Sequence, residues 1–222
     1  MSRSRRFGPV PAAELPGVRA RAVFVEHFLF ERFPMIGGFL DHRTPFQLLV
    51  AVVLSARCTD RQVNRVTEQL FAEAHTAEQL ANLPLERLEE LIHSVGFFRQ
   101  KARALKGLAN KIIVAFSGAV PCNFPDLESL PGVGHKTASV LLGQWAGIPT
   151  FPVDTHVWRL ARRWRLSEGR TVAAVERDLK NLFLPARWMG LHLRMIAYGR
   201  SDCGARRCDG TKCDICRQLK RL

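Results

Sequence analysis

Apolar residues recur every three or four positions along almost the whole chain, which is the period of α-helices that bury one face. The alternation of apolar and polar residues that marks a half-buried strand is nearly absent. We therefore predict an all-α fold. The expected helices span about residues 18–33, 46–55, 60–71, 77–81, 85–92, 99–116, 126–130, 135–146, 155–164, 172–183 and 187–199.

The segment from Phe46 to Ser55 is apolar on every side, which predicts a helix at the centre of the fold. Thr44 and Pro45 precede it, and these residue types favour the N-cap and the first helical position. The run is shorter than the roughly 20 apolar residues that a helix needs to cross a bilayer. We therefore expect no membrane-spanning helix and a cytoplasmic protein.

Basic residues dominate the charge of the chain. Lysine and arginine number 33 against 20 aspartates and glutamates, so the formal net charge is +13. Such an excess indicates an anionic polymer or an anionic surface as the partner. A basic protein without such a partner is the alternative.

A glycine-containing turn, Leu130-Pro131-Gly132-Val133-Gly134, joins two segments of helical periodicity and predicts a helix-hairpin-helix at residues 126–146. Glycine lets backbone N–H groups approach a phosphate closely, and the N-terminus of the second helix attracts the same anion. Such contacts read no base, so the hairpin would bind nucleic acid without sequence preference. The alternative is an ordinary glycine cap. The candidate DNA-binding residues here are Gly132, Val133, Gly134, His135 and Thr137.

Lys136 and Asp154 are the candidate catalytic residues. Lys136 lies in the first turn of the helix after the glycine turn, where the positive end of the helix dipole disfavours a charged ammonium. A nucleophilic lysine needs a neutral amine, whereas a phosphate-binding lysine is the alternative. Asp154 stands where an N-cap is expected, just before a helix. Its carboxylate is either only a cap or also a group that deprotonates Lys136 or stabilises positive charge on a sugar.

Four of the six cysteines fall within fourteen residues near the C-terminus. In a reducing compartment this clustering favours a metal site over disulfides. Four thiolates suit either a [4Fe-4S] cluster, which we predict, or a tetrahedral zinc ion. Cys58 and Cys122 stand apart and are expected to be idle thiols. The candidate metal ligands are Cys203, Cys208, Cys213 and Cys216.

The motifs LPGVGHKTAS and FPVDTHVWRLARR, together with the terminal cysteines, resemble the endonuclease III family of DNA glycosylases, within the helix-hairpin-helix superfamily. The similarity extends from about Phe28 to Cys216. It implies a bifunctional glycosylase and abasic-site lyase of base excision repair that acts on oxidised pyrimidines, with Lys136 and Asp154 as its catalytic residues. In that family the damaged base is flipped out of the duplex, and the lysine attacks C1′ to form a Schiff base. β-Elimination then cleaves the strand 3′ to the abasic site.

The chain departs from the family pattern at its DNA-contacting positions. Two family loops fill the hole left by the flipped base. Arg57 stands where glutamine is usual in the first loop, and Phe97 stands where an aliphatic residue is usual in the second. His135 replaces a frequent arginine, and the resemblance also places His156 among the DNA contacts. These changes leave the preferred base open.

The cysteine spacing departs most. The family binds its [4Fe-4S] cluster with the pattern C-x6-C-x2-C-x5-C, whereas this chain reads C-x4-C-x4-C-x2-C. We therefore expect Cys208 to supply the fourth thiolate through a rearranged loop.

The resemblance predicts two helical domains. One is a six-helix barrel at residues 38–148 that contains the hairpin, and the other joins residues 1–37 to 149–222 and holds the cluster. Lys136 and Asp154 are expected to face each other across the groove between them. The predicted partner is double-stranded DNA with damaged bases or abasic sites, bound by a monomer associated with the bacterial nucleoid. The alternatives are a damage-recognition protein with weak catalysis and a glycosylase for alkylated or mismatched bases.

Overall fold

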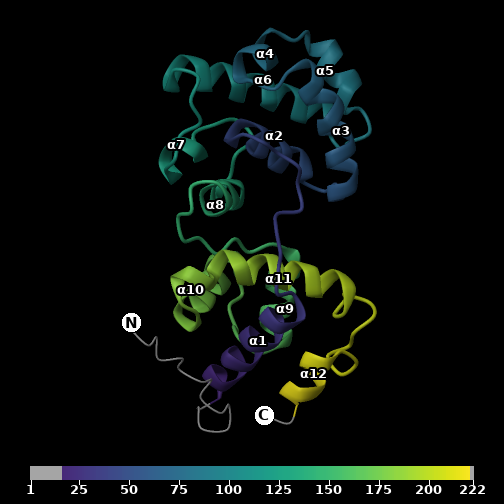
Figure 1. Ribbon diagram of the computed structural model, residues 1–222, viewed down its shortest axis with the longest axis vertical. Helices are drawn as coiled ribbons and strands as arrows, with labels where there is room; N and C mark the ends of the chain where they lie inside the picture. Colours follow the sequence, from purple (N-terminus) through teal and green to yellow (C-terminus); the bar gives the residue numbers. More distant parts are fainter. Residues whose placement is uncertain (1–16, 221–222) are drawn as a thin grey trace, which may run out of the picture. The chain divides into compact units, whose positions relative to one another are not determined.

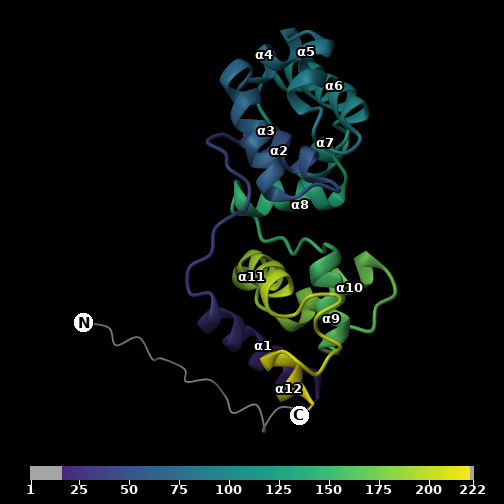
Figure 2. The same cartoon turned by 90° about the vertical axis from the view of Figure 1, so that its right-hand side faces the viewer.

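The computed structural model describes residues 17–220, and this part of the chain is built of helices without a strand (Figures 1 and 2). The predicted all-α fold is confirmed. What was expected for residues 1–16 and 221–222 lies outside the described residues. Over the described range, no helix is long and apolar enough to cross a membrane.

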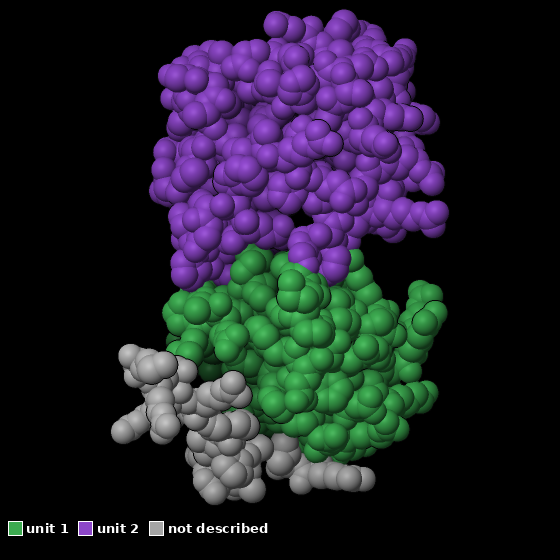
Figure 3. Space-filling view, viewed as in Figure 1, with its two compact units in different colours: residues 1–36, 153–222 green, residues 37–152 purple. Residues whose placement is uncertain are grey.

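The chain divides into two compact units, which Figure 3 shows in different colours. Unit 2 covers residues 37–152, and unit 1 joins residues 1–36 to residues 153–222. Unit 2 contains α2 (Pro45–Ser55), α3 (Asp60–Glu73), α4 (Ala77–Asn82), α5 (Leu85–Ile92), α6 (Phe98–Phe116), α7 (Phe124–Glu128) and α8 (His135–Gln144). Unit 1 contains α1 (Val18–Arg32), α9 (Thr155–Arg163), α10 (Val172–Leu182), the 3-10 turn η2 (Pro185–Arg187), α11 (Trp188–Ser201) and α12 (Asp214–Leu219).

Helix α2 is the apolar centre of unit 2. All its residues from Phe46 to Leu54 are buried, and it contacts α3, α6 and α8 (Figure 1). Its start follows the prediction: Oγ1 of Thr44 accepts a hydrogen bond from the Gln47 amide (3.1 Å), and Pro45 is the first helical residue. The burial of one helix on every side fixes the positions of the helices around it.

Helix α6 connects the ends of three other helices through lysines spaced five residues apart. Each lysine donates hydrogen bonds from Nζ to carbonyl oxygens at the C-terminal end of another helix, where these oxygens have no partner within their own helix. Lys101 bonds Leu54 (2.9 Å) and Ala56 (2.6 Å) at the end of α2. Lys106 bonds Leu80 (3.3 Å), Ala81 (2.5 Å) and Leu83 (2.6 Å) at the end of α4, and Lys111 bonds Ser129 (2.8 Å) at the end of α7.

Helix α11 is central to unit 1, where it contacts α1 and α9. The Tyr198 ring lies 5.8 Å from the Phe28 ring and 5.9 Å from the Trp164 ring, so one aromatic group joins three helical segments. The Tyr198 hydroxyl also accepts a hydrogen bond from the Ile215 amide of α12 (3.3 Å). This bond ties the last helix to the core of unit 1.

The structure differs from the expected helices at two places. Helix α7 begins at Phe124 and not at residue 126, because the side chain of Asn123 caps it by accepting a hydrogen bond from the Asp126 amide (2.9 Å). Helix α12 was not predicted. It has six residues, too few to show a helical period, and its buried Ile215 and Leu219 hold it in place.

Replacement of single side chains on α6 tests how much its buried face contributes to stability. We expect Leu105→Ala, which removes a fully buried side chain, to lower the free energy of unfolding by about 2–5 kcal/mol. Val114→Ala on the same helix removes an 86% exposed side chain and should change it by less than about 0.5 kcal/mol. Urea unfolding followed by circular dichroism measures both, and equal effects would contradict the packing described.

Candidate functional site

The hairpin turn runs from Leu130 to Gly134, between α7 and α8. Gly132 has φ +78°, and a Cβ there would lie 3.1 Å from Cβ of Ala104 and 3.6 Å from Cγ1 of Val53. Backbone conformation and space therefore both require glycine at this position. A Cβ on Gly134 would meet nothing within 4 Å, and no side chain caps α8 at this residue. The first glycine is needed for packing, and the second leaves an open helix N-terminus.

Two side chains of the hairpin lie at the start of α8 with different partners. His135 is held by α7: its Nδ1 lies 2.8 Å from Oε1 of Glu128, and its ring stacks on Phe124 with the centroids 4.9 Å apart. Lys136 is exposed and has no hydrogen-bond or ion-pair partner among residues 17–220. Its amine is therefore open to a reactant from outside the chain.

Asp154 is the N-cap of α9, as predicted. Its Oδ1 accepts a hydrogen bond from the Val157 amide (2.7 Å). The side chain is half-buried, and the structure gives its second carboxylate oxygen no hydrogen-bond partner within the described part of the chain. Lys136 belongs to unit 2 and Asp154 to unit 1. Nζ of Lys136 and the second carboxylate oxygen of Asp154 are therefore each without a hydrogen-bond partner within the described residues.

His156 lies against α11 within unit 1. A Cβ on Gly199 would be 3.1 Å from its Nδ1, so the absence of a side chain at Gly199 makes room for the imidazole. Burial lowers the pKa of His156 below its ordinary value, and the neighbouring Asp154 opposes this shift while Arg159 and Arg200 add to it. Its expected contact with DNA stays a prediction.

The four clustered cysteines converge in unit 1. Their side chains are buried, and their sulfur atoms all lie within 4.8 Å of one another. Cys203 and Cys208 belong to the loop after α11, Cys213 is the residue before α12 and Cys216 lies inside α12, so this loop and α12 supply the thiols. Such a donor set suits a metal centre.

Positive groups and N–H donors surround these sulfurs. Nη1 of Arg163 donates to Sγ of Cys203 (3.2 Å), and Nη2 of Arg159 donates to the carbonyl oxygens of Gly199 (2.9 Å) and Cys203 (3.0 Å). Burial raises the pKa of the Cys208 thiol, but backbone N–H groups of the same loop outweigh burial and lower it. The hydrogen bond with Cys213 instead raises the pKa of the Cys203 thiol to about 12. Metals bind the thiolate form, so the N–H donors around Cys208 favour metal binding at that thiol.

Arg57 and Phe97, which the sequence placed on separate loops, lie together in unit 2. Both have positive φ, 55° and 60°, and the Arg57 guanidinium lies 5.4 Å from the centroid of the Phe97 ring. Phe97 is 59% exposed. They border a pocket of about 420 Å³ that also includes Gly132 of the hairpin. The structure therefore brings the two loops and the hairpin to one site.

The other five residues that line this pocket were not among the predicted site residues, and three of them, Gln100, Lys101 and Ala104, belong to α6. Lys101 carried a signal, because it stands four residues before Leu105 on the apolar face of α6, where a charged side chain is unexpected. Gln100 and Ala104 carried none, because polar and small residues are ordinary on a helix surface.

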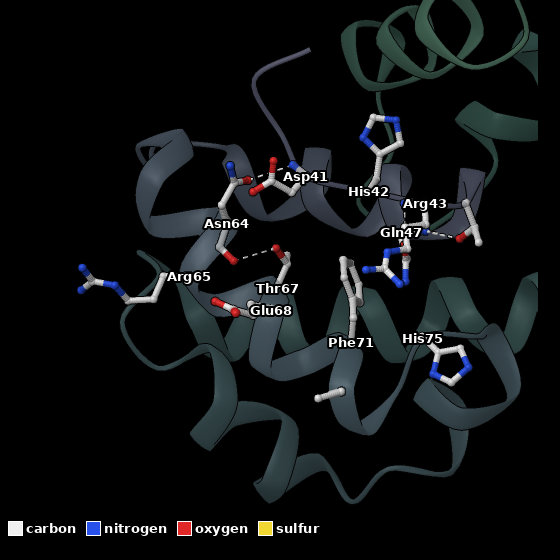
Figure 4. Close-up of a pocket in the computed structure, with 12 residues that line it drawn as sticks. Asp41, His42, Arg43, Gln47, Asn64, Arg65, Thr67, Glu68, Phe71 and His75 are labelled. Atoms are coloured by element: carbon white, nitrogen blue, oxygen red, sulfur yellow. Dashed lines mark hydrogen bonds between the residues drawn. The ribbon is translucent and has the colours of Figure 1, made fainter. Parts of the chain in front are cut away.

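A larger pocket of about 740 Å³ lies between α3 and the segment that precedes α2 (Figure 4). None of the predicted site residues borders it. Asn64 is bonded on both sides of its amide, accepting from the Asp41 amide (3.1 Å) and donating to the Phe39 carbonyl (3.1 Å). These bonds hold the segment before α2 on α3, which is a structural role.

Comparison with known proteins bears on this arrangement. The family model described as "HhH-GPD superfamily base excision DNA repair protein" matches residues 50–185. Endonuclease III of Synechocystis sp. is 42% identical over 190 residues, which are 85% of this chain and 87% of that protein. Endonuclease III of Treponema pallidum is 44% identical over 197 residues, which are 86% and 93% of the two chains.

Solved structures agree. A trapped covalent intermediate of endonuclease III with DNA superposes with a TM-score of 0.86 at 38% identity, over 91% of this chain and 97% of that one. A thermostable thymine-DNA glycosylase, 22% identical with a TM-score of 0.76 over 88% and 93% of the two chains, shares the fold. The fold and the hairpin define a base excision DNA repair glycosylase of the helix-hairpin-helix class. Within that class the chain belongs to the endonuclease III family, and its activity is that of a DNA glycosylase with abasic-site lyase activity.

Titration of His156 gives a test of the α9 environment. Because burial lowers its pKa in the folded chain, the unfolded chain binds more protons below about pH 6.5, the ordinary value. The contribution of this residue to stability is complete above that pH and is lost as the pH falls below it. We expect the free energy of unfolding of the wild type to fall more between about pH 7 and pH 5 than that of His156→Gln.

The control for this measurement is His75→Gln, which removes an exposed imidazole from unit 2. It should keep the wild-type dependence on pH. Identical pH profiles for the wild type and His156→Gln would contradict a buried, neutral His156.

Proposed function

We propose that this chain removes oxidised pyrimidines from double-stranded DNA and cleaves the resulting abasic site, with Lys136 as the nucleophile. The observation that carries the proposal is the exposed Lys136, without a partner among residues 17–220, in the first turn of a helix that follows a glycine hairpin. A trapped covalent intermediate with DNA is known for a structural relative of 38% identity. The same chemistry in this chain needs an amine, and Lys136 supplies one.

The proposed reaction consists of base removal, ring opening, β-elimination and hydrolysis. Neutral Nζ of Lys136 attacks C1′ of the deoxyribose, and the bond from C1′ to the damaged base breaks, so that the base leaves with the electron pair and takes up a proton. Nζ loses a proton, the bond from C1′ to O4′ breaks and O4′ takes up a proton, so that the opened sugar is joined to Lys136 by a Schiff base. Loss of a proton from C2′ then breaks the bond from C3′ to its oxygen, and the 3′ phosphate leaves. Water hydrolyses the Schiff base and returns the amine.

In these reaction steps, Asp154 stabilises positive charge that develops on the sugar or on Lys136. Its carboxylate caps the N-terminus of α9 through one oxygen. The carboxylate oxygen that the cap leaves free stabilises positive charge on the sugar or accepts the proton of Lys136.

The DNA contacts follow from the hairpin and the two loops. Backbone N–H groups of Gly132 and Gly134 bind phosphate at the open start of α8, and Val133, His135 and Thr137 border the same place. The Val133 amide itself donates to the Leu130 carbonyl oxygen within the turn (3.1 Å). Arg57 and Phe97 fill the hole that the flipped base leaves, and the exposed Phe97 ring is suited to stacking. His156 contacts DNA from α9.

The metal group that we propose is a [4Fe-4S] cluster on Cys203, Cys208, Cys213 and Cys216, with zinc as the alternative. A bound cluster would link α11 to α12 and supply no step of base removal. Arg206, Arg207 and Lys212 belong to the loop between these helices, and they add positive charge for DNA phosphates. We place the protein on bacterial chromosomal DNA in the cytoplasm, acting as a monomer.

Replacement of Lys136 tests the nucleophile. We expect Lys136→Gln to form no covalent adduct when borohydride is added to the protein and a duplex with an abasic site, because a Schiff base needs an amine. The adduct is measured on a denaturing gel. The control Lys220→Gln, which removes an exposed lysine outside the hairpin and the loops, should trap DNA as the wild type does. An adduct with Lys136→Gln would show that another amine is the nucleophile.

Replacement of one cysteine tests the fourth ligand. We expect wild-type protein to be yellow-brown and to contain iron and sulfide, and Cys208→Ser to lose both because one thiolate is missing. Metal analysis and visible absorption measure this. Cys122→Ser, which removes an exposed thiol outside the group, should keep the full content. Zinc without visible absorption would select the alternative metal, and full iron in Cys208→Ser would place the fourth ligand elsewhere.

A further inference from the structure

The turn that carries Arg57 is strained. Helix α2 ends at Ser55, Ala56 turns away with ψ 116°, and Arg57 adopts the left-handed conformation with φ 55°. A residue other than glycine adopts this backbone conformation at a cost in free energy. The conformation persists only where the surrounding structure holds it. Some contact must therefore fix the turn.

Lys101 makes that contact. It is only 7% exposed, and its Nζ donates to the carbonyl oxygens of Leu54 (2.9 Å) and Ala56 (2.6 Å), on either side of Ser55. Burial lowers the pKa of Lys101, and the neighbouring Cys58 opposes this shift. A buried amine with two carbonyl partners is costly to replace, because removal of the amine leaves both oxygens without a donor.

The same residue reaches the second loop through its backbone. Phe97 precedes α6 in the left-handed conformation, and the Lys101 amide donates to its carbonyl oxygen (3.0 Å). The loops also lie close to each other, since a Cβ on Gly96 would be 3.7 Å from the Arg57 carbonyl oxygen. The Lys101 side chain thus holds the turn of Arg57, while the first backbone hydrogen bond of α6, which does not depend on the side chain, places Phe97 beside it.

We propose that Lys101 is a positioning residue for base flipping, whose side chain holds the turn of Arg57 beside Phe97 so that the two side chains form one preassembled wedge. The proposal rests on the role that the proposed function gives to Arg57 and Phe97. A wedge fixed before DNA binds loses less conformational freedom when it enters the duplex. Lys101 itself does not touch the reacting atoms.

The experiment compares two substrates that differ in their need for a wedge. Base release from a duplex with thymine glycol requires flipping, whereas borohydride trapping on single-stranded DNA with one abasic site does not. We expect Lys101→Met to slow single-turnover base release about 10- to 100-fold, the effect typical of misplaced groups, and to leave trapping at the wild-type rate. Lys101→Arg keeps the charge and the donors and should restore much of the release rate.

The matched control is Lys106→Met, which removes a lysine of the same helix that bonds carbonyls at the end of α4 and not those of the Arg57 turn. It should keep the wild-type ratio of the two rates. Thermal unfolding of each variant reports a general loss of stability. If Lys101→Met does not fold, Lys101→Gln, whose shorter amide reaches fewer carbonyls, takes its place with the same expected split between substrates.

The outcomes separate this inference from the proposed function. Slow release by Arg57→Ala together with normal release by Lys101→Met would overturn the role of Lys101 and leave the wedge intact. Normal release by both Arg57→Ala and Phe97→Ala would overturn the wedge assignment. A parallel loss on both substrates in the Lys101 variants, without recovery in Lys101→Arg, would show that the lysine only stabilises the fold and would also overturn the inference.

Discussion

A methyl group on Gly132 would lie 3.1 Å from Cβ of Ala104, so the hairpin turn approaches α6 only because residue 132 has no side chain. This approach fixes the start of α8 and with it the position of Lys136 in unit 2. Helix α6 also has Phe97 at its N-terminal end, and its Lys101 bonds the turn of Arg57. The proposed nucleophile, phosphate contacts and wedge of unit 2 therefore all depend on the packing around α6.

In unit 1, α9 links the candidate carboxylate to the cysteines. Asp154 caps its N-terminus, while Arg163 in its last turn donates to the sulfur of Cys203. Arg159, on the turn between them, bonds the carbonyl oxygens of Gly199 and Cys203. A metal bound by the four thiols would thus stabilise the helix that presents Asp154, even though we give it no part in the reaction.

Much of the fold and part of the site could be predicted from local patterns. The caps at Thr44 and Asp154 were predicted because a short polar side chain before an apolar period satisfies the first amides of the helix. The cysteines were predicted as a group because they are close in sequence. Helix α12 was missed because six residues show no period. Lys101 was missed because its partners, Leu54 and Ala56, are more than forty residues away in the chain.

The sequence by itself determined the helical class, the hairpin, the candidate Lys136 and Asp154, and the family, since each of these is written in neighbouring residues or in their spacing. Only the tertiary structure decided that Arg57 and Phe97 lie together, that Gly132 is needed for packing against Ala104, and that the buried Lys101 donates to the carbonyl oxygen of Ala56. These contacts join residues from separate helices and turns. Their geometry depends on how apolar burial brings α2, α6 and the hairpin together, and no local pattern records it.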